Sequence, residues 1–140
     1  NVAELAALAG MEVRDDASLR AATQKLVELG ARAVVVTGGH LPKPVDLLYD
    51  GKEFLPFTSE RVRSENKHGS GCTFSAAIAT HLALGRQLPD AVMLAKAYVA
   101  RAIERGFAIG KGPGPLNHFH RFHQEPSHRP TEPASAGYPR

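Results

Sequence analysis

The sequence has a single cysteine, no tryptophan and two methionines among its 140 residues. One cysteine excludes a disulfide within the chain and is typical of a reducing compartment, so we expect a cytoplasmic protein. No apolar run is long enough to span a membrane and no signal peptide is visible, so we expect no membrane partner. Basic residues form no run although the formal net charge is +3, so we expect no nucleic-acid partner either.

Two common phosphate-binding signatures are also missing. No Gly-Lys-Ser/Thr follows a suitable glycine, as a Walker A loop requires, and the Gly-x-Gly-x-x-Gly pattern of dinucleotide-binding folds is absent. A different glycine-rich loop is present, because residues 66–79 read Asn-Lys-His-Gly-Ser-Gly-Cys-Thr-Phe-Ser-Ala-Ala-Ile-Ala. The small residues 69–71 therefore lead directly into a small and apolar segment that predicts a helix.

The start of this predicted helix is a candidate anion site. The first N–H groups of a helix have no partner inside it, and the helix dipole adds positive charge at that end. Glycines such as Gly69 and Gly71 let a ligand approach the backbone around Ser70 closely. Helix N-termini also favour the thiolate form of cysteine, so Cys72 is a candidate base. The alternative is a tight turn followed by a cysteine that packs as a small hydrophobe.

The remaining sequence predicts alternating helices and strands. A β-branched run at residues 33–37 is typical of a strand that is covered on both faces, as in a parallel sheet, and a helix precedes it, which indicates an α/β fold. Asp50-Gly51 predicts a hairpin between strands at 45–49 and 53–57. The predicted helices are residues 2–8, ended by Gly10; a helix capped by Asp15 or Asp16 and closed by Gly30; residues 72–84, ended by Gly85; and a helix from Pro89 to Gly106.

One domain is expected over residues 1–122, followed by a disordered, proline-rich tail at 123–140. Four of the seven histidines gather near this tail, and we expect them to be solvated rather than metal-binding: His118, His120, His123 and His128.

Two further pairs are weaker candidates for a site. Asn1 and Glu4 share a face at a helix start, where an amide and a carboxylate can hold Mg²⁺ through water. Thr37 and Gly39 lie at the carboxyl end of the predicted parallel strand, where ligands gather in open α/β sheets, although a plain turn would also explain the glycines.

Several segments in collinear order resemble the hydroxymethylpyrimidine/phosphomethylpyrimidine kinases of the ribokinase-like superfamily. Residues 66–79 resemble the signature of that family, residues 35–41 its strand and loop, residues 46–51 its hairpin, and residues 110–119 its closing loop. The resemblance implies a three-layer αβα sheet with a small β-hairpin. It extends over residues 1–119 and matches only the carboxyl-terminal half of the family's much longer chains, so we expect a truncated piece that is inactive alone.

The resemblance also implies roles for individual residues in ATP-dependent phosphorylation of 4-amino-5-hydroxymethyl-2-methylpyrimidine and its monophosphate, as in thiamine biosynthesis. Gly69, Ser70, Gly71 and Cys72 would surround the transferring phosphoryl group, with Cys72 as the base. Asn1 and Glu4 would organise Mg²⁺. The residues expected on the ATP side are Thr37, Gly39, Asn66, His68, Lys111 and Gly112.

The alternatives that stay open are a pyridoxal kinase of the same superfamily, because some of those enzymes share the cysteine, and a non-catalytic nucleotide-binding remnant. An exposed sheet edge would favour pairing into a homodimer, but the sequence leaves the oligomeric state open.

Overall fold

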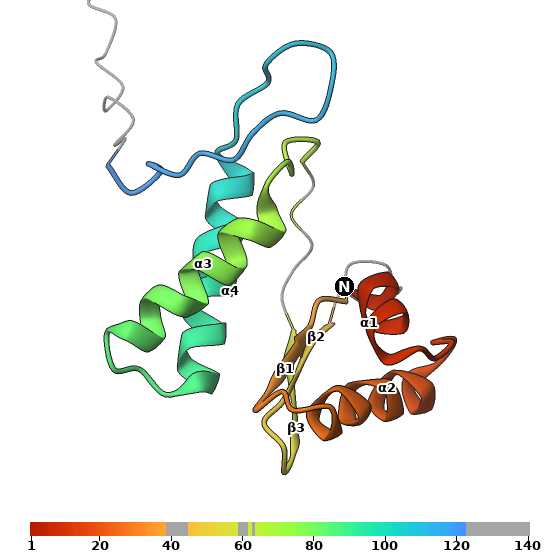
Figure 1. Ribbon diagram of the computed structural model, residues 1–140. Coiled ribbons are helices and arrows are strands. Elements are labelled where there is room, and N and C mark those ends of the chain that lie inside the picture. Colours follow the sequence, from red (N-terminus) through yellow and green to blue (C-terminus); the bar gives the residue numbers. More distant parts are fainter. Residues whose placement is uncertain (39–44, 59–61, 63, 123–140) are drawn as a thin grey trace, which may run out of the picture.

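A computed structural model describes residues 1–38, 45–58, 62 and 64–122 (Figure 1). The remaining residues, which include the tail expected from residue 123 onward, lie outside this description. The elements follow one another in the order α1 (Val2–Ala9), α2 (Asp16–Glu28), β1 (Val34–Val36), β2 (Val45–Tyr49), β3 (Phe54–Thr58), α3 (Ser70–Ala83) and α4 (Leu88–Glu104).

The described residues form three layers, with the sheet between two helix pairs (Figure 1). Alternate side chains of a strand face opposite sides, so β2 directs Leu47 towards α1 and α2 and Leu48 towards α3 and α4. On the first side Leu47 packs with Leu5 and Leu19. On the second side Leu48 packs with Phe74 and other apolar residues of α3 and α4. The three-layer α/β arrangement that the sequence predicted is therefore confirmed.

Within the described residues the sheet has three strands in the order β1-β2-β3, and both pairings are antiparallel. Val35 lies opposite Leu48 in the first pair, and Leu48 lies opposite Leu55 in the second. The predicted hairpin around Asp50 is confirmed, and the Asp50 carboxylate accepts hydrogen bonds from the N–H groups of Lys52 and Glu53. The prediction of a parallel sheet is wrong for these residues, because β1 pairs only with β2 among the described strands. β1 packs against helices on both of its faces, and this burial explains the β-branched composition of β1 without a parallel sheet.

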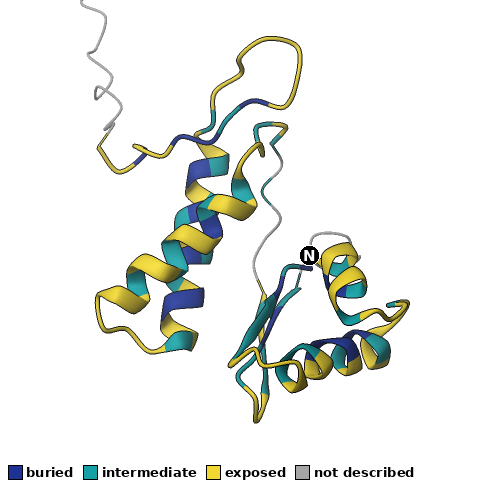
Figure 2. Cartoon of the chain, viewed as in Figure 1, coloured by how far each residue is buried: buried dark blue, intermediate teal, exposed yellow. Residues whose placement is uncertain are grey.

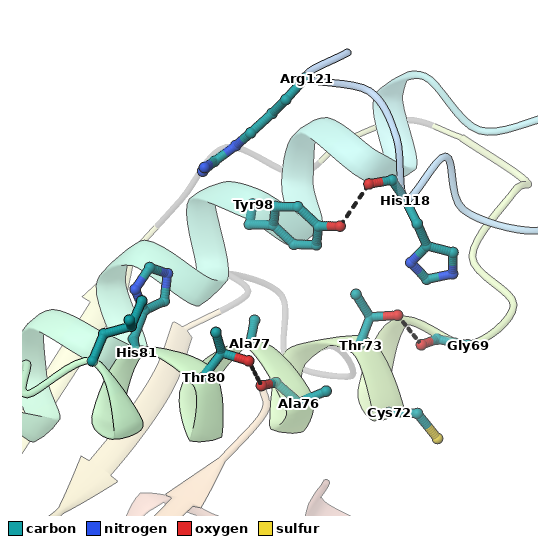
Figure 3. A pocket seen from close by; sticks show the side chains of 11 residues that line it. Gly69, Cys72, Thr73, Ala76, Ala77, Thr80, His81, Tyr98, His118 and Arg121 are labelled. Atoms are coloured by element: carbon teal, nitrogen blue, oxygen red, sulfur yellow. Dashed lines mark hydrogen bonds between the residues drawn. The ribbon is translucent and has the colours of Figure 1, made fainter. Parts of the chain in front are cut away.

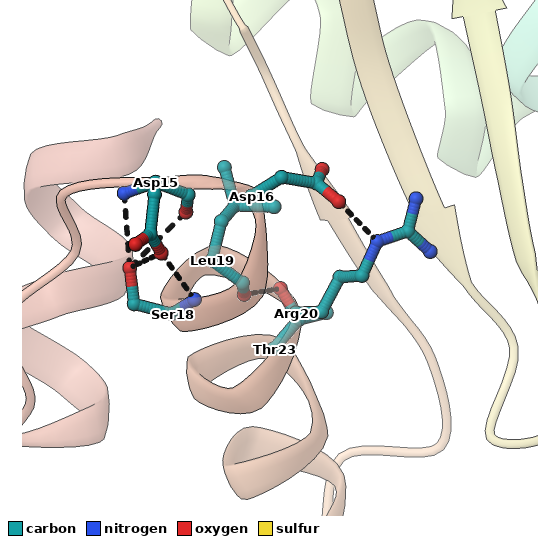
Figure 4. A network of polar contacts seen from close by, with 6 residues as sticks. All are labelled: Asp15, Asp16, Ser18, Leu19, Arg20 and Thr23. Carbon is teal, nitrogen blue, oxygen red and sulfur yellow. Dashed lines mark hydrogen bonds and ion pairs between the residues drawn. The ribbon is translucent and has the colours of Figure 1, made fainter.

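The helix ends follow local chemistry. Asp15 caps α2 by accepting the Ser18 N–H at 2.8 Å, and the Ser18 hydroxyl accepts the Asp15 N–H at 3.0 Å (Figure 4). Gly10 ends α1 in the left-handed conformation, and Gly85 follows α3 with a φ of 80°. These residues fix the lengths of the helices, so the predicted helices are confirmed to within a few residues.

Helix α3 is exposed over most of its surface, and Phe74 is its only buried residue (Figure 2). It packs along α4, which buries five residues. In the described part of the chain, no helix combines the length and the hydrophobicity needed to cross a membrane.

Candidate functional site

The candidate site begins at the N-terminus of α3. Gly69 is the N-cap and has no side chain with which to cap the helix. The first intrahelical acceptor is the Gly69 carbonyl, which accepts the Thr73 N–H at 3.0 Å and the Thr73 hydroxyl at 2.8 Å. The N–H groups of Gly71 and Cys72 precede this bond and have no acceptor within the described residues. Two donors are therefore available to an anion at the positive end of the helix dipole.

Glycine is present at residues 69 and 71 of this loop for two different physical reasons. Gly69 adopts a φ of 86°, a left-handed conformation that side chains with a Cβ rarely tolerate. Gly71 has no such requirement, and a Cβ added there would meet nothing within 4 Å. The space above the Gly71 backbone is thus open to a ligand.

A pocket of about 690 Å³ lies beside this helix end (Figure 3). Its floor is α3 and its far wall is Tyr98 of α4 together with His118 and Arg121. The Tyr98 hydroxyl donates to the His118 carbonyl at 2.8 Å, and the Arg121 guanidinium lies 5.5 Å from the centre of the Tyr98 ring. The complete lining is Gly69, Cys72, Thr73, Ala76, Ala77, Thr80, His81, Leu84, Tyr98, His118 and Arg121.

Cys72 is an exposed free thiol at the edge of this pocket. Figure 3 shows its Sγ pointing away from Tyr98 and His118. The alternative of a cysteine packed as a small hydrophobe is therefore wrong. The Sγ atom therefore lies at the rim of the pocket, on the side away from Tyr98 and His118.

The closing loop after α4 is joined to the segment that leads into α3. The His68 N–H donates to the Gly114 carbonyl at 3.2 Å, and His68 and Pro115 form a parallel bridge. Gly114 is required here, because an added Cβ would collide with the Phe107 carbonyl and the Asn66 side chain. The structure therefore brings Asn66 and His68 next to the residues that follow α4.

The other residues predicted on the ATP side are not gathered at this pocket. Thr37 follows β1 and is half-buried, and Gly39 lies outside the described residues. Lys111 and Gly112 are exposed in the closing loop. Neither lines the pocket beside α3.

Asn1 and Glu4 form the capping box of α1. The Asn1 side chain accepts the Glu4 N–H at 3.0 Å, and the Glu4 carboxylate pairs with the amino group of Asn1 at 2.8 Å. That amino group lowers the pKa of Glu4 below its usual value. No hydrogen bond or ion pair joins either residue to residues 69–72 in the described part of the chain. Among the described residues there is no group of three or more His, Cys, Asp or Glu side chains that could hold a metal ion.

His120 overturns the expectation of a solvated histidine-rich end. Its side chain is buried, with 4% of the residue exposed, whereas His118 is exposed. The His120 ring packs against Tyr98 at 4.9 Å between centroids, because the chain folds back over α4 after Asn117. Tyr98 and Arg121 were missed as site residues, since no spacing in the sequence connects them with residue 69.

The three-layer fold places the chain in a class, the proteins with a ribokinase-like fold. The chain aligns with a *Bacillus subtilis* pyridoxal kinase solved as an ADP complex, with a TM-score of 0.80 and 36% identity. The alignment covers 88% of this chain and 50% of that one. The chain belongs to the phosphomethylpyrimidine kinase family, because the family model matches residues 1–117.

Two curated relatives agree with this assignment. A bifunctional thiamine biosynthesis protein of *Geobacter sulfurreducens* is 46% identical over 84% of this chain, which covers 24% of that protein. A hydroxymethylpyrimidine/phosphomethylpyrimidine kinase of *Rhizobium meliloti* is 42% identical over 87% of this chain, which covers 48% of that protein. The chain therefore spans half or less of the length of these relatives.

Proposed function

We propose that the protein to which this chain belongs transfers the γ-phosphoryl group of ATP to 4-amino-5-hydroxymethyl-2-methylpyrimidine and then to its monophosphate. The observation that carries this proposal is the pair of unpartnered N–H groups at Gly71 and Cys72, next to an exposed thiol. Phosphoryl transfer depends mainly on positioning and on stabilisation of negative charge, which such donors supply. The thiamine-related names of the two relatives support the pyrimidine as acceptor.

The residues divide the work by position. The N–H groups of residues 71 and 72 hold the phosphoryl oxygens, and Gly69 and Ser70 set the turn that directs them. The Cys72 thiolate accepts the proton of the acceptor hydroxyl while that oxygen bonds to phosphorus, and ADP leaves with the electron pair of the broken P–O bond. Because the thiol points away from Tyr98, we place the acceptor on the thiol side of the helix end.

We assign Mg²⁺ to Asn1 and Glu4, whose side-chain oxygens also form the capping box of α1. Asn1 and Glu4 are exposed oxygen donors, as Mg²⁺ prefers when it is held through water, and Mg²⁺ supplies charge neutralisation of the phosphates when bound. We assign Thr37, Gly39, Asn66, His68, Lys111 and Gly112 to the nucleotide side. A cytoplasmic location and a homodimer remain part of the proposal.

A pyridoxal kinase is the second candidate, favoured by the structural similarity to the *B. subtilis* enzyme. Both are tested with the product of the complete reading frame, assayed for ADP release with the pyrimidine alcohol, its monophosphate and pyridoxal. Turnover of both pyrimidines at rates well above pyridoxal is expected. A preference for pyridoxal would establish the second candidate. Nucleotide binding without turnover of any acceptor would indicate a non-catalytic remnant.

A further inference from the structure

A largely buried ion pair joins α4 to one edge of the sheet. The Lys96 Nζ and the Asp46 Oδ2 lie 2.6 Å apart, and the two side chains are 13% and 16% exposed. Lys96 also donates to the Phe57 carbonyl at 2.8 Å, and the other Asp46 oxygen accepts the Gly38 N–H at 3.0 Å. The two side chains therefore connect α4 with β2, with β3 and with the residue pair that follows β1.

These contacts lie at the edge of the sheet where a ligand is expected. β1 and β3 both run antiparallel to β2, so they run parallel to each other and their carboxyl ends share an edge. Phe57 is the next-to-last residue of β3, and Gly38 lies two residues beyond the end of β1. Ligands of α/β sheets bind outside the carboxyl ends of such strands. The ion pair thus holds the edge to which Thr37 belongs.

The backbone after β1 is held by a side chain and not by the strand ladder. The pairing of β1 with β2 ends at Val36. Gly38 is buried, so its N–H needs a partner, and the Asp46 carboxylate supplies one. A Cβ at residue 38 would collide with the Val45 carbonyl, so Gly38 lies directly against the start of β2. The orientation of Thr37, between Val36 and Gly38, therefore depends on the Asp46 carboxylate.

Stability alone does not explain a charged pair at this position. Two apolar side chains of similar volume often stabilise a protein as well as a buried ion pair does, because both charges lose their hydration on burial. Charged groups add direction, since their hydrogen bonds are short and strong. Lys96 fixes one oxygen of Asp46, and the other oxygen is thereby aimed at the Gly38 N–H.

We propose that Asp46 and Lys96 are positioning residues for the nucleotide. Asp46 holds the Gly38 N–H and so fixes the backbone that presents Thr37 to ATP, while Lys96 fixes the Asp46 carboxylate from α4. Both residues act through Thr37 and not by contact with the reacting atoms. This inference rests on the proposed function, in which Thr37 lies on the nucleotide side.

Two double variants of the product of the complete reading frame separate this role from stability. Lys96→Met/Asp46→Asn removes both charges and keeps an oxygen for the Gly38 N–H, whereas Lys96→Met/Asp46→Leu has nearly the same shape and no acceptor. Calorimetry should show that the Leu variant binds ATP on the order of tenfold more weakly than the Asn variant, as for one lost hydrogen bond to a charged group. The KM for the acceptor should be the same in both. Equal ATP affinities of the two folded variants would overturn the inference.

A measurement on the natural protein covers the case in which the Leu variant does not fold. The N–H groups of Gly38 and Glu53 both bond to a carboxylate, but Glu53 lies in the hairpin at the opposite end of the strands. Saturation with ATP should slow hydrogen exchange at Gly38 on the order of tenfold more than at Glu53, because the nucleotide opposes local opening of the backbone that it contacts. Equal slowing at the two amides would also overturn the inference.

The outcomes for this inference and for the proposed function are distinguishable. A natural protein that binds no ATP would overturn both of them. Phosphorylation of an acceptor by a natural protein whose two double variants bind ATP equally well would overturn the positioning role alone.

Discussion

Lys96 of α4 and Asp46 of β2 form a largely buried ion pair of 2.6 Å between Nζ and Oδ2, although 50 residues separate them in the sequence. Lys96 also donates to the Phe57 carbonyl of β3 at 2.8 Å, and the other Asp46 oxygen accepts the Gly38 N–H at 3.0 Å. Lys96 thus connects α4 to both β2 and β3. The Asp46 carboxylate also holds the backbone at Gly38, just after the end of β1.

Removing the lysine charge should therefore destabilise the fold. Lys96→Met leaves Asp46 with an uncompensated, largely buried charge, and we expect a loss of about 3 kcal/mol in the free energy of unfolding. Urea denaturation followed by circular dichroism measures it. Lys25→Met, which breaks the exposed pair with Glu28, is the control and should change stability by less than about 1 kcal/mol. Equal losses in the two variants would show that the Lys96 pair has no special weight.

Two glycine-to-alanine changes should separate the site from the fold. Gly71→Ala meets no neighbouring atom and adds a better helix former, so stability should rise by about 0.5–1 kcal/mol. The same methyl group obstructs the unpartnered amides, so we expect ATP affinity of the full-length protein to fall by at least about tenfold, as for a lost charge-assisted bond. Unfolding and nucleotide titration measure the two effects.

Gly114→Ala is the opposite case. The new Cβ collides with the Phe107 carbonyl, so we expect a loss of about 1–3 kcal/mol in stability from overpacking. If Gly71→Ala destabilised the chain as much as Gly114→Ala, the space around residue 71 would not be open, and a ligand could not occupy it.

The proposed base gives a prediction that depends on the acceptor. In the product of the complete reading frame, Cys72→Ala should lower kcat for the pyrimidine alcohol by at least about 100-fold, the usual contribution of a general base. The monophosphate acceptor is largely ionised near neutral pH and needs little help, so its kcat should fall by less than about tenfold. Steady-state rates with the two acceptors measure the ratio. Equal losses would remove the base role from Cys72.

The cap of α2 should make stability depend on acidity. The Ser18 hydroxyl and then the Ser18 N–H lower the pKa of Asp15, because both bond to the carboxylate. A carboxyl with a lower pKa when folded stabilises the protein above its unfolded value of about 3.9, and that contribution is lost as pH falls through the folded pKa. Asp15→Asn keeps a capping oxygen but cannot titrate. Urea unfolding at a series of pH values should therefore show a smaller acid loss for Asp15→Asn than for the natural chain.

Glu4 and Asp50 also have lowered pKa values, so part of the acid loss should persist in the Asp15→Asn variant. Identical pH profiles for the two proteins would contradict the role of the Asp15 cap.

The sequence predicted the elements whose ends are set by local chemistry. Gly10, Asp15 and Gly85 bound helices through their own backbone or side-chain preferences, and each acts where it was expected. The features that were missed depend on distant residues. β1 pairs in the antiparallel direction with β2, which follows it in the chain. His120 is buried because the chain returns over Tyr98. Neither contact between distant residues produces a periodic pattern in the sequence.

The candidate site also combines features that local sequence determines with features that depend on distant residues. The open amides at residues 71 and 72 follow from a glycine-rich start to a helix, which is a local property. Tyr98, His118 and Arg121 line the same pocket only because the chain folds back over α4, and no spacing in the sequence marks this arrangement.

The bridge between His68 and Pro115 has a consequence for motion. The His68 N–H bonds to the Gly114 carbonyl and ties the approach of α3 to the closing loop, while the Phe107 N–H bonds to the Pro115 carbonyl and closes that loop on itself. Exchange of a nucleotide at the α3 N-terminus would thus require these two segments to swing as one unit, and the amides of residues 68 and 107 should exchange with solvent at a common rate.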